Sequence, residues 1–127
     1  MTEAERQLIT ALAAEARGPR RNGLFALWLL TRTAEALLPP APVSPRGHRR
    51  RVELLQRRLA SLSVPAPLRR ALSAALRHVG EGTPQGTALA LHQLVAPARE
   101  TVGERAAAAL TAAAARARQA MTDGEKR

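Results

Sequence analysis

Cysteine is missing from the 127 residues of the chain. Its absence excludes disulfide bonds, thiolate ligands for metals and a cysteine nucleophile. It also removes the usual mark of a protein built for an oxidising compartment. The first residues, Thr2 to Glu5, are acidic where a secretory signal would be basic, so we expect a cytoplasmic protein.

Long hydrophobic runs are missing as well. The most apolar stretch, residues 24–30, is soon followed by Arg32 and Glu35. A membrane-spanning helix needs about 20 predominantly apolar residues, so this stretch is too short to cross a bilayer. We therefore expect no association with a membrane.

Aromatic side chains are scarce, since Phe25 and Trp28 are the only two and the chain has no tyrosine. Apolar residues still make up 46% of the chain, and most of them are leucine or alanine. These two residues favour helices, whereas strands favour β-branched and aromatic residues. The composition therefore predicts an all-α fold, and the length fits one domain. It also leaves no aromatic pattern on which nucleic-acid bases would stack.

Lysine is almost absent, because Lys126 is the only one beside 19 arginines, and the net charge is +10. A balance this basic indicates an acidic partner, such as nucleic acid, an anionic surface or an acidic protein. The planar guanidinium fork suits phosphate and carboxylate groups. The alternative is the codon bias of a GC-rich genome, in which case the arginines have no common role.

Capping patterns mark where the helices begin. Two T-x-x-E patterns, Thr2 with Glu5 and Thr101 with Glu104, predict capping boxes. A hydroxyl residue followed by proline, at positions 44–45 and 83–84, predicts two further starts. Pro97 is expected to end or kink the fifth helix.

These signals predict a compact antiparallel bundle of five to six helices. The expected helices cover residues 2–17, 22–38, 45–62, 67–79, 84–95 and 101–121. The first half of the second one is apolar on all sides, which predicts that it lies at the centre of the core. We expect a single helical domain over residues 1–121 and a flexible polar tail over residues 122–127.

The third helix carries the strongest functional signal. Between positions 46 and 58, six arginines stand against the single acid Glu53, a net charge of +5. If the third and fourth helices pack as a hairpin, their outer arginines form one patch suited to phosphate-backbone contacts. The predicted nucleic-acid-binding residues are Arg46, Arg49, Arg50, Arg57, Arg58, Arg70 and Arg77. The alternative is a solvated helix face on which Glu53 pairs with Arg49 and Arg57.

Two further features indicate contacts with protein. Leu54 lies within the basic side of the third helix, where a leucine is either a partner contact or ordinary surface. The last helix has a stripe of small residues at spacings of three and four, which either packs inside the bundle or meets a second copy or another protein. The stripe consists of Val102, Ala106, Ala109, Ala113 and Ala117, and its four alanines are the predicted interface residues.

The sequence offers no catalytic or metal-binding motif. The three histidines, His48, His78 and His92, form no H-E-x-x-H or E-x-x-H pattern, and His92 is the one expected to be partly buried. The glycine-rich turn at 80–86 lacks the lysine of a phosphate-binding loop, so we interpret it as a turn between helices. We expect no catalytic residue, metal or cofactor.

The leading hypothesis is a non-enzymatic helical accessory subunit whose arginine-rich face contacts the backbone of RNA or DNA, or another polyanion, without reading sequence. The alternative is a protein–protein adaptor or homo-oligomeric helical scaffold that binds no nucleic acid. In that case the arginines pair with an acidic protein or only maintain solubility.

Overall fold

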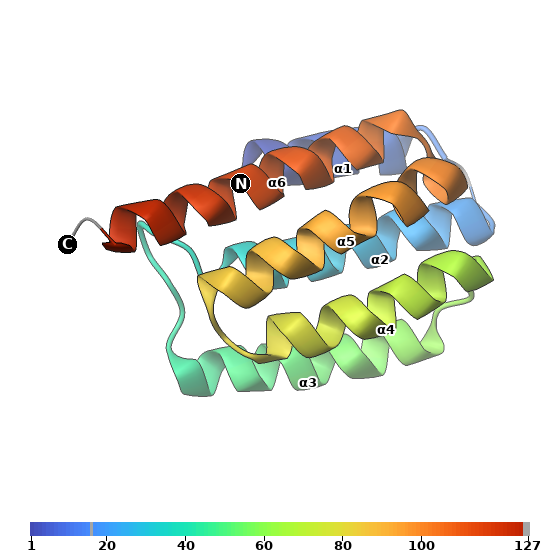
Figure 1. Ribbon diagram of the computed structural model, residues 1–127. Helices are drawn as coiled ribbons and strands as arrows, with labels where there is room; N and C mark the ends of the chain where they lie inside the picture. Colours follow the sequence, from blue (N-terminus) through green and yellow to red (C-terminus); the bar gives the residue numbers. More distant parts are fainter. Residues whose placement is uncertain (16, 126–127) are drawn as a thin grey trace.

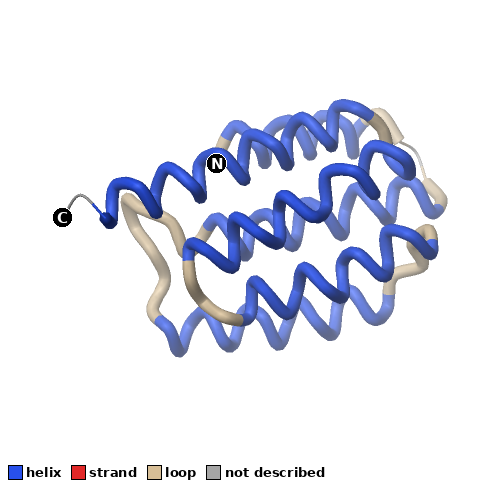
Figure 2. The backbone as a smooth tube through the Cα atoms, viewed as in Figure 1, coloured by secondary structure: helices blue, strands red, loops and turns tan. Residues whose placement is uncertain are grey.

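The computed structural model describes residues 1–15 and 17–125. Within these ranges the chain forms six α-helices and no strand. The helices are α1 (Glu3–Ala13), α2 (Pro19–Glu35), α3 (Pro45–Ser61), α4 (Ala66–Gly80), α5 (Pro84–Val102) and α6 (Glu104–Glu125). The all-α bundle predicted from the composition is confirmed. Figure 2 shows a long connection between α2 and α3 and shorter loops elsewhere.

The helices form two layers of three (Figure 1). One layer contains α1, α2 and α3 in chain order, and the other contains α4, α5 and α6. Across the layers α1 packs on α6, α2 on α5 and α3 on α4. The pair of α3 and α4 therefore forms one edge of the molecule, and the pair of α1 and α6 forms the opposite edge.

Helix α2 is the central element, as its apolar sequence predicts. It contacts all five other helices, and Leu24, Leu27 and Leu30 are at most 1% exposed. Gly23 leaves room for side chains of α4 and α5, because an added Cβ would stand 2.9 Å from Leu68 and 3.0 Å from Val102. No helix in the described ranges has the length and hydrophobicity needed to cross a bilayer.

A buried carboxylate at the end of α2 connects that helix to α1 and α6. The Glu35 side chain is 3% exposed. Its carboxylate accepts hydrogen bonds from the Thr2 hydroxyl at 2.6 Å and the Arg116 guanidinium at 3.0 Å. Thr2 also accepts a bond from the Glu5 amide at 3.2 Å, which confirms the hydroxyl half of the predicted capping box. In the described part of the chain, the Glu5 carboxylate makes no return bond to the Thr2 amide. Glu35 thus holds the start of α1 and the second half of α6 at the end of α2.

The predicted restart at Thr101 is wrong. Helix α5 continues past Pro97 to Val102, because its packing against α4 and α6 outweighs the lost backbone donor and the steric clash that an interior proline brings. It ends at Gly103, whose φ of 108° lies in the region that glycine adopts without strain. Thr101 therefore lies inside α5, where its hydroxyl donates to the Pro97 carbonyl at 2.7 Å instead of capping α6.

Other helix ends also differ from the prediction. Helix α1 ends at Ala13 instead of near Arg17, and α2 begins at Pro19, which occupies the first helical position. Helix α6 runs to Glu125, so residues 122–125 of the predicted tail are helical. A hydrogen bond from the Gln119 side chain to Asp123, four residues later, supports this extension. Lys126 and Arg127 lie outside the described residues.

Candidate nucleic-acid interface

Helix α3 is attached to the bundle by a narrow apolar stripe. It begins as predicted, with Pro45 at its first position and the Ser44 hydroxyl accepting from the Gly47 amide at 3.1 Å. Of its 17 residues only His48 and Leu55 are buried. It packs against α2 and α4, and its remaining surface faces solvent. This shallow attachment leaves the arginines of α3 accessible.

The predicted arginines are all exposed. Arg46, Arg50 and Arg57 lie roughly opposite Leu55 around the axis of α3, at 100° per residue. Arg70 and Arg77 lie in the same way on the outer side of α4. Because α3 and α4 pack together at one edge of the bundle (Figure 1), the two rows lie on adjacent helices. We name this surface the arginine edge, formed by Arg46, Arg49, Arg50, Arg57, Arg70 and Arg77.

Most of the net charge of the protein is concentrated on these two helices. Residues 45–80 hold nine arginines and one acid, Glu53, a net charge of +8 out of the total of +10. The rest of the chain holds 11 basic and nine acidic side chains, a net charge of only +2. Arginines that had accumulated through genome composition alone would be spread over the surface. Here they are instead concentrated on two adjacent helices.

The positive charge of α3 is not compensated by ion pairs. Elsewhere four arginines pair with carboxylates: Arg6 with Glu3, Arg20 with Glu15, Arg99 with Glu104 and Arg116 with Glu35. Within the described part of the chain, no carboxylate lies within 4.0 Å of an arginine of α3 or α4. The pairing of Glu53 with Arg49 and Arg57, which the solvated-face alternative expected, is not formed.

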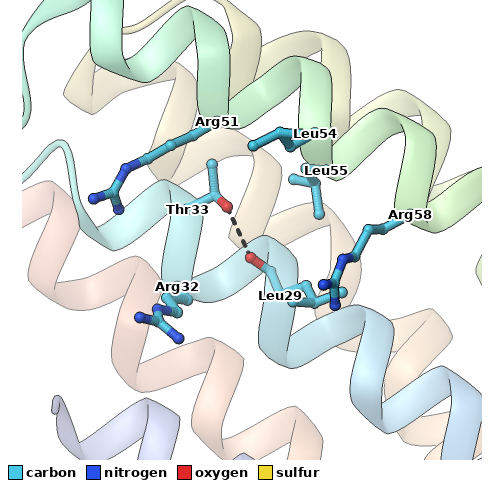
Figure 3. A pocket seen from close by; sticks show the side chains of 7 residues that line it. All are labelled: Leu29, Arg32, Thr33, Arg51, Leu54, Leu55 and Arg58. Atoms are coloured by element: carbon cyan, nitrogen blue, oxygen red, sulfur yellow. Dashed lines mark hydrogen bonds between the residues drawn. The ribbon is translucent and has the colours of Figure 1, made fainter.

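Arg58 lies apart from the arginine edge, on the side of α3 that faces α2. It lines a groove of about 230 Å³ between these two helices, together with Arg32 of α2 and Arg51 of α3. Figure 3 shows Arg51 and Arg58 at the two ends of the groove, with Leu54 and Leu55 between them. The placement of Arg58 on the outward face is therefore corrected, because it lies only about 60° from Leu55 around the helix axis.

Arg32 and Arg51 are not among the predicted binding residues. Residues 51, 54, 55 and 58 follow the spacing of three, four and seven that places side chains on one helical stripe, and this signal was available in the sequence. Arg32 joins the stripe only through the packing of α2 on α3. Its guanidinium carbon lies 5.6 Å from the centre of the Trp28 ring, a cation–π contact.

The alanine stripe is covered by the chain itself. All four of its alanines are at most 1% exposed, and α6 packs against α1 and α5. Small side chains let these helices approach closely, so the stripe serves the bundle and presents no surface to a second chain. This corrects the assignment of Ala106, Ala109, Ala113 and Ala117 to a protein interface. Leu54, by contrast, is 54% exposed.

The buried histidine is His48, not His92. The buried stripe of α5 passes through Leu91, Leu94 and Ala98, and His92 falls outside it. The Nε2 atom of His48 lies 2.7 Å from the Val79 carbonyl oxygen, a hydrogen bond that joins α3 to α4. In the ranges that the structure describes, no three histidine or acidic side chains gather as metal ligands would.

The glycine-rich turn before α5 uses its own groups for capping. The Thr83 hydroxyl accepts from the Gly86 amide at 3.0 Å, which occupies a donor that a phosphate would need.

Comparisons with known proteins offer no relative from which a function is carried over. No family model, no curated protein and no solved structure matches this chain.

Proposed function

We propose that this protein is a helical accessory subunit that binds the phosphate backbone of a nucleic acid through the arginine edge. The observation that carries the proposal is that the six arginines of the arginine edge are all exposed, and that no carboxylate in the described part of the chain pairs with them. Like charges at this density repel one another. A polyanion relieves that repulsion, and a nucleic acid supplies negative charges in a regular row.

The dimensions of the arginine edge suit a phosphate backbone. Arg46 and Arg57 are separated by about 16 Å along the axis of α3, since an α-helix rises 1.5 Å per residue. Successive phosphates of one DNA strand advance about 3.4 Å along the duplex axis. A row of arginines this long spans roughly five such steps, and Arg70 and Arg77 on α4 widen the contact.

The proposed binding is independent of base sequence. Phe25 and Trp28, the two aromatic residues, lie on α2 and not on the arginine edge, so no ring is placed there for base stacking. Guanidinium groups that contact phosphates position a protein on its ligand but carry no sequence information. We therefore expect comparable affinity for RNA and DNA of different sequences, and a role in holding a nucleic acid instead of transforming it.

Charge reversal at the arginine edge tests this proposal. The variant R50E/R57E removes two exposed arginines that lie opposite Leu55 on α3. The matched control R105E/R118E changes two exposed, unpaired arginines of α6 and lowers the net charge by the same amount. Fluorescence anisotropy with a labelled single-stranded RNA and a labelled DNA duplex measures both affinities at low salt.

We expect R50E/R57E to lose at least about tenfold in affinity for each nucleic acid, because each phosphate contact is replaced by a repulsion. R105E/R118E should retain most of the wild-type affinity. Equal losses in the two variants would reduce the effect to net charge and contradict a specific edge. Absence of binding by the wild-type protein at low salt would remove the nucleic-acid proposal altogether.

A further inference from the structure

We propose that the groove between α2 and α3 is a docking site for an acidic amphipathic helix of a partner protein. We name it the Leu54 groove, lined by Leu29, Arg32, Thr33, Arg51, Leu54, Leu55 and Arg58. The proposal does not depend on the arginine edge, because Arg50 and Arg57 do not line this groove.

The apolar part of the groove calls for an apolar contact. Leu54 is 54% exposed, and among the described residues the other exposed large hydrophobic side chains are Met1 and Leu89. The partly exposed Leu29 of α2 extends the apolar surface of Leu54 across the two helices, and the buried Leu55 lines the groove between them (Figure 3). Covering this surface removes apolar area from water, which a bare phosphate backbone does not do.

The arginines of the groove determine the charge that a partner must carry. Arg51 and Arg58 lie three residues before and four residues after Leu54, so they flank it along α3. Arg32 adds a third guanidinium from α2. Within the described part of the chain no carboxylate lies within 4.0 Å of these three groups. Any segment that covers Leu54 therefore meets positive charge at both ends, and carboxylates on that segment complement it.

The size and shape of the groove favour a helix over a small molecule. A volume of about 230 Å³ is below the roughly 300–1,000 Å³ of typical ligand pockets. The groove lies between two helices, and an amphipathic helix fits such a surface by inserting apolar side chains spaced at three, four and seven residues. The proposed partner helix places leucine-type side chains on Leu54 and glutamate or aspartate beside the three arginines.

A designed peptide tests this assignment directly. The probe is a fluorescein-labelled helical peptide of about 18 residues, with leucines along one face and glutamates on the remaining positions. Its control is a scrambled peptide of identical composition and charge, in which the leucines do not share a face. Anisotropy measures the binding of both peptides to the full-length protein.

Two pairs of variants separate the groove from the rest of the surface. L54S removes the exposed leucine of the groove, and L89S removes an exposed leucine of α5 that is 42% exposed and lies outside the groove. R51Q/R58Q removes the two flanking charges, and R50Q/R57Q removes the same number from the arginine edge. Circular dichroism and thermal melting establish that each variant keeps the fold.

We expect the amphipathic peptide to bind the wild-type protein and L89S equally, and to bind L54S and R51Q/R58Q about tenfold more weakly. R50Q/R57Q should keep the wild-type affinity for the peptide but bind nucleic acid more weakly. Each pair of substitutions then impairs only one of the two sites. Equal binding of the scrambled peptide would mean that the groove recognises charge alone, and this would overturn the proposal. Loss of nucleic-acid binding in L54S, without any effect on the peptide, would assign the groove to the nucleic acid and overturn it too.

Discussion

Arg116 of α6 donates a hydrogen bond of 3.0 Å to the carboxylate of Glu35 at the end of α2, across 81 positions of sequence. The same guanidinium donates to the Pro39 carbonyl at 2.7 Å. Arg116 therefore fixes both the carboxylate and the start of the connection that leads to α3. Arg116 thus joins elements of the bundle, whereas the arginines of α3 and α4 are exposed and have no carboxylate within 4.0 Å in the described part of the chain.

Replacing Arg116 with alanine should lower the free energy of unfolding by about 2–3 kcal/mol. Breaking a buried ion pair costs about 3–5 kcal/mol, because the remaining charge stays buried without its partner. We expect a smaller loss than this for Arg116, because its side chain is 36% exposed and the Thr2 hydroxyl still contacts Glu35 after the substitution. Urea denaturation measures the change. The control R118A removes an exposed arginine of the same helix, and equal stability of the two variants would argue against the proposed role of the pair.

Gly86 should not tolerate a side chain. A Cβ at this position would stand 2.3 Å from the His78 carbonyl oxygen, and backbone cannot move aside as a side chain can. We expect G86A to destabilise the protein by about 1–3 kcal/mol through overpacking of α4 against α5. The matched control is G80A at the end of α4, where a Cβ meets nothing within 4 Å. Thermal melting should show a loss for G86A and none for G80A.

The alanines of α6 should respond to enlargement according to their burial. Ala113 is fully buried, whereas its neighbour Ala112 is exposed. A113L should cost about 1–3 kcal/mol because it forces extra methylene groups into a packed interior, and A112L should leave the stability within about 0.5 kcal/mol of the wild type. Chemical denaturation of both variants checks this. If A113L were neutral, the stripe would be less tightly covered than the structure shows.

The sequence predicted those elements that depend on local chemistry. Ser44 with Pro45 and Thr83 with Pro84 begin α3 and α5 at the expected positions, because hydroxyl capping and a preset φ act within one turn. The central position of α2 followed from its apolar sequence. All predicted arginines are exposed, since a charged side chain without a partner avoids the interior.

Features that depend on packing escaped prediction. Helix α5 continues through Pro97 because tertiary contacts outweigh the loss of one backbone hydrogen bond. His48 is buried because the packing of α3 on α4 places its ring against the Val79 carbonyl at 2.7 Å, whereas His92 lies outside the buried stripe of α5. The Leu54 groove brings Arg32 to Arg51 and Arg58, and only the packing of α2 on α3 creates this group.

The most direct test of the arginine edge is the salt dependence of DNA binding. For duplex DNA the slope of log K against log salt is about −0.9 for each phosphate neutralised. If all six arginines of the edge contact phosphates, the wild-type slope should lie near −5, and R50Q/R57Q should be shallower by about 2. R105Q/R118Q should keep the wild-type slope. A wild-type slope near −1, or the same slope in R50Q/R57Q as in the wild type, would contradict the account.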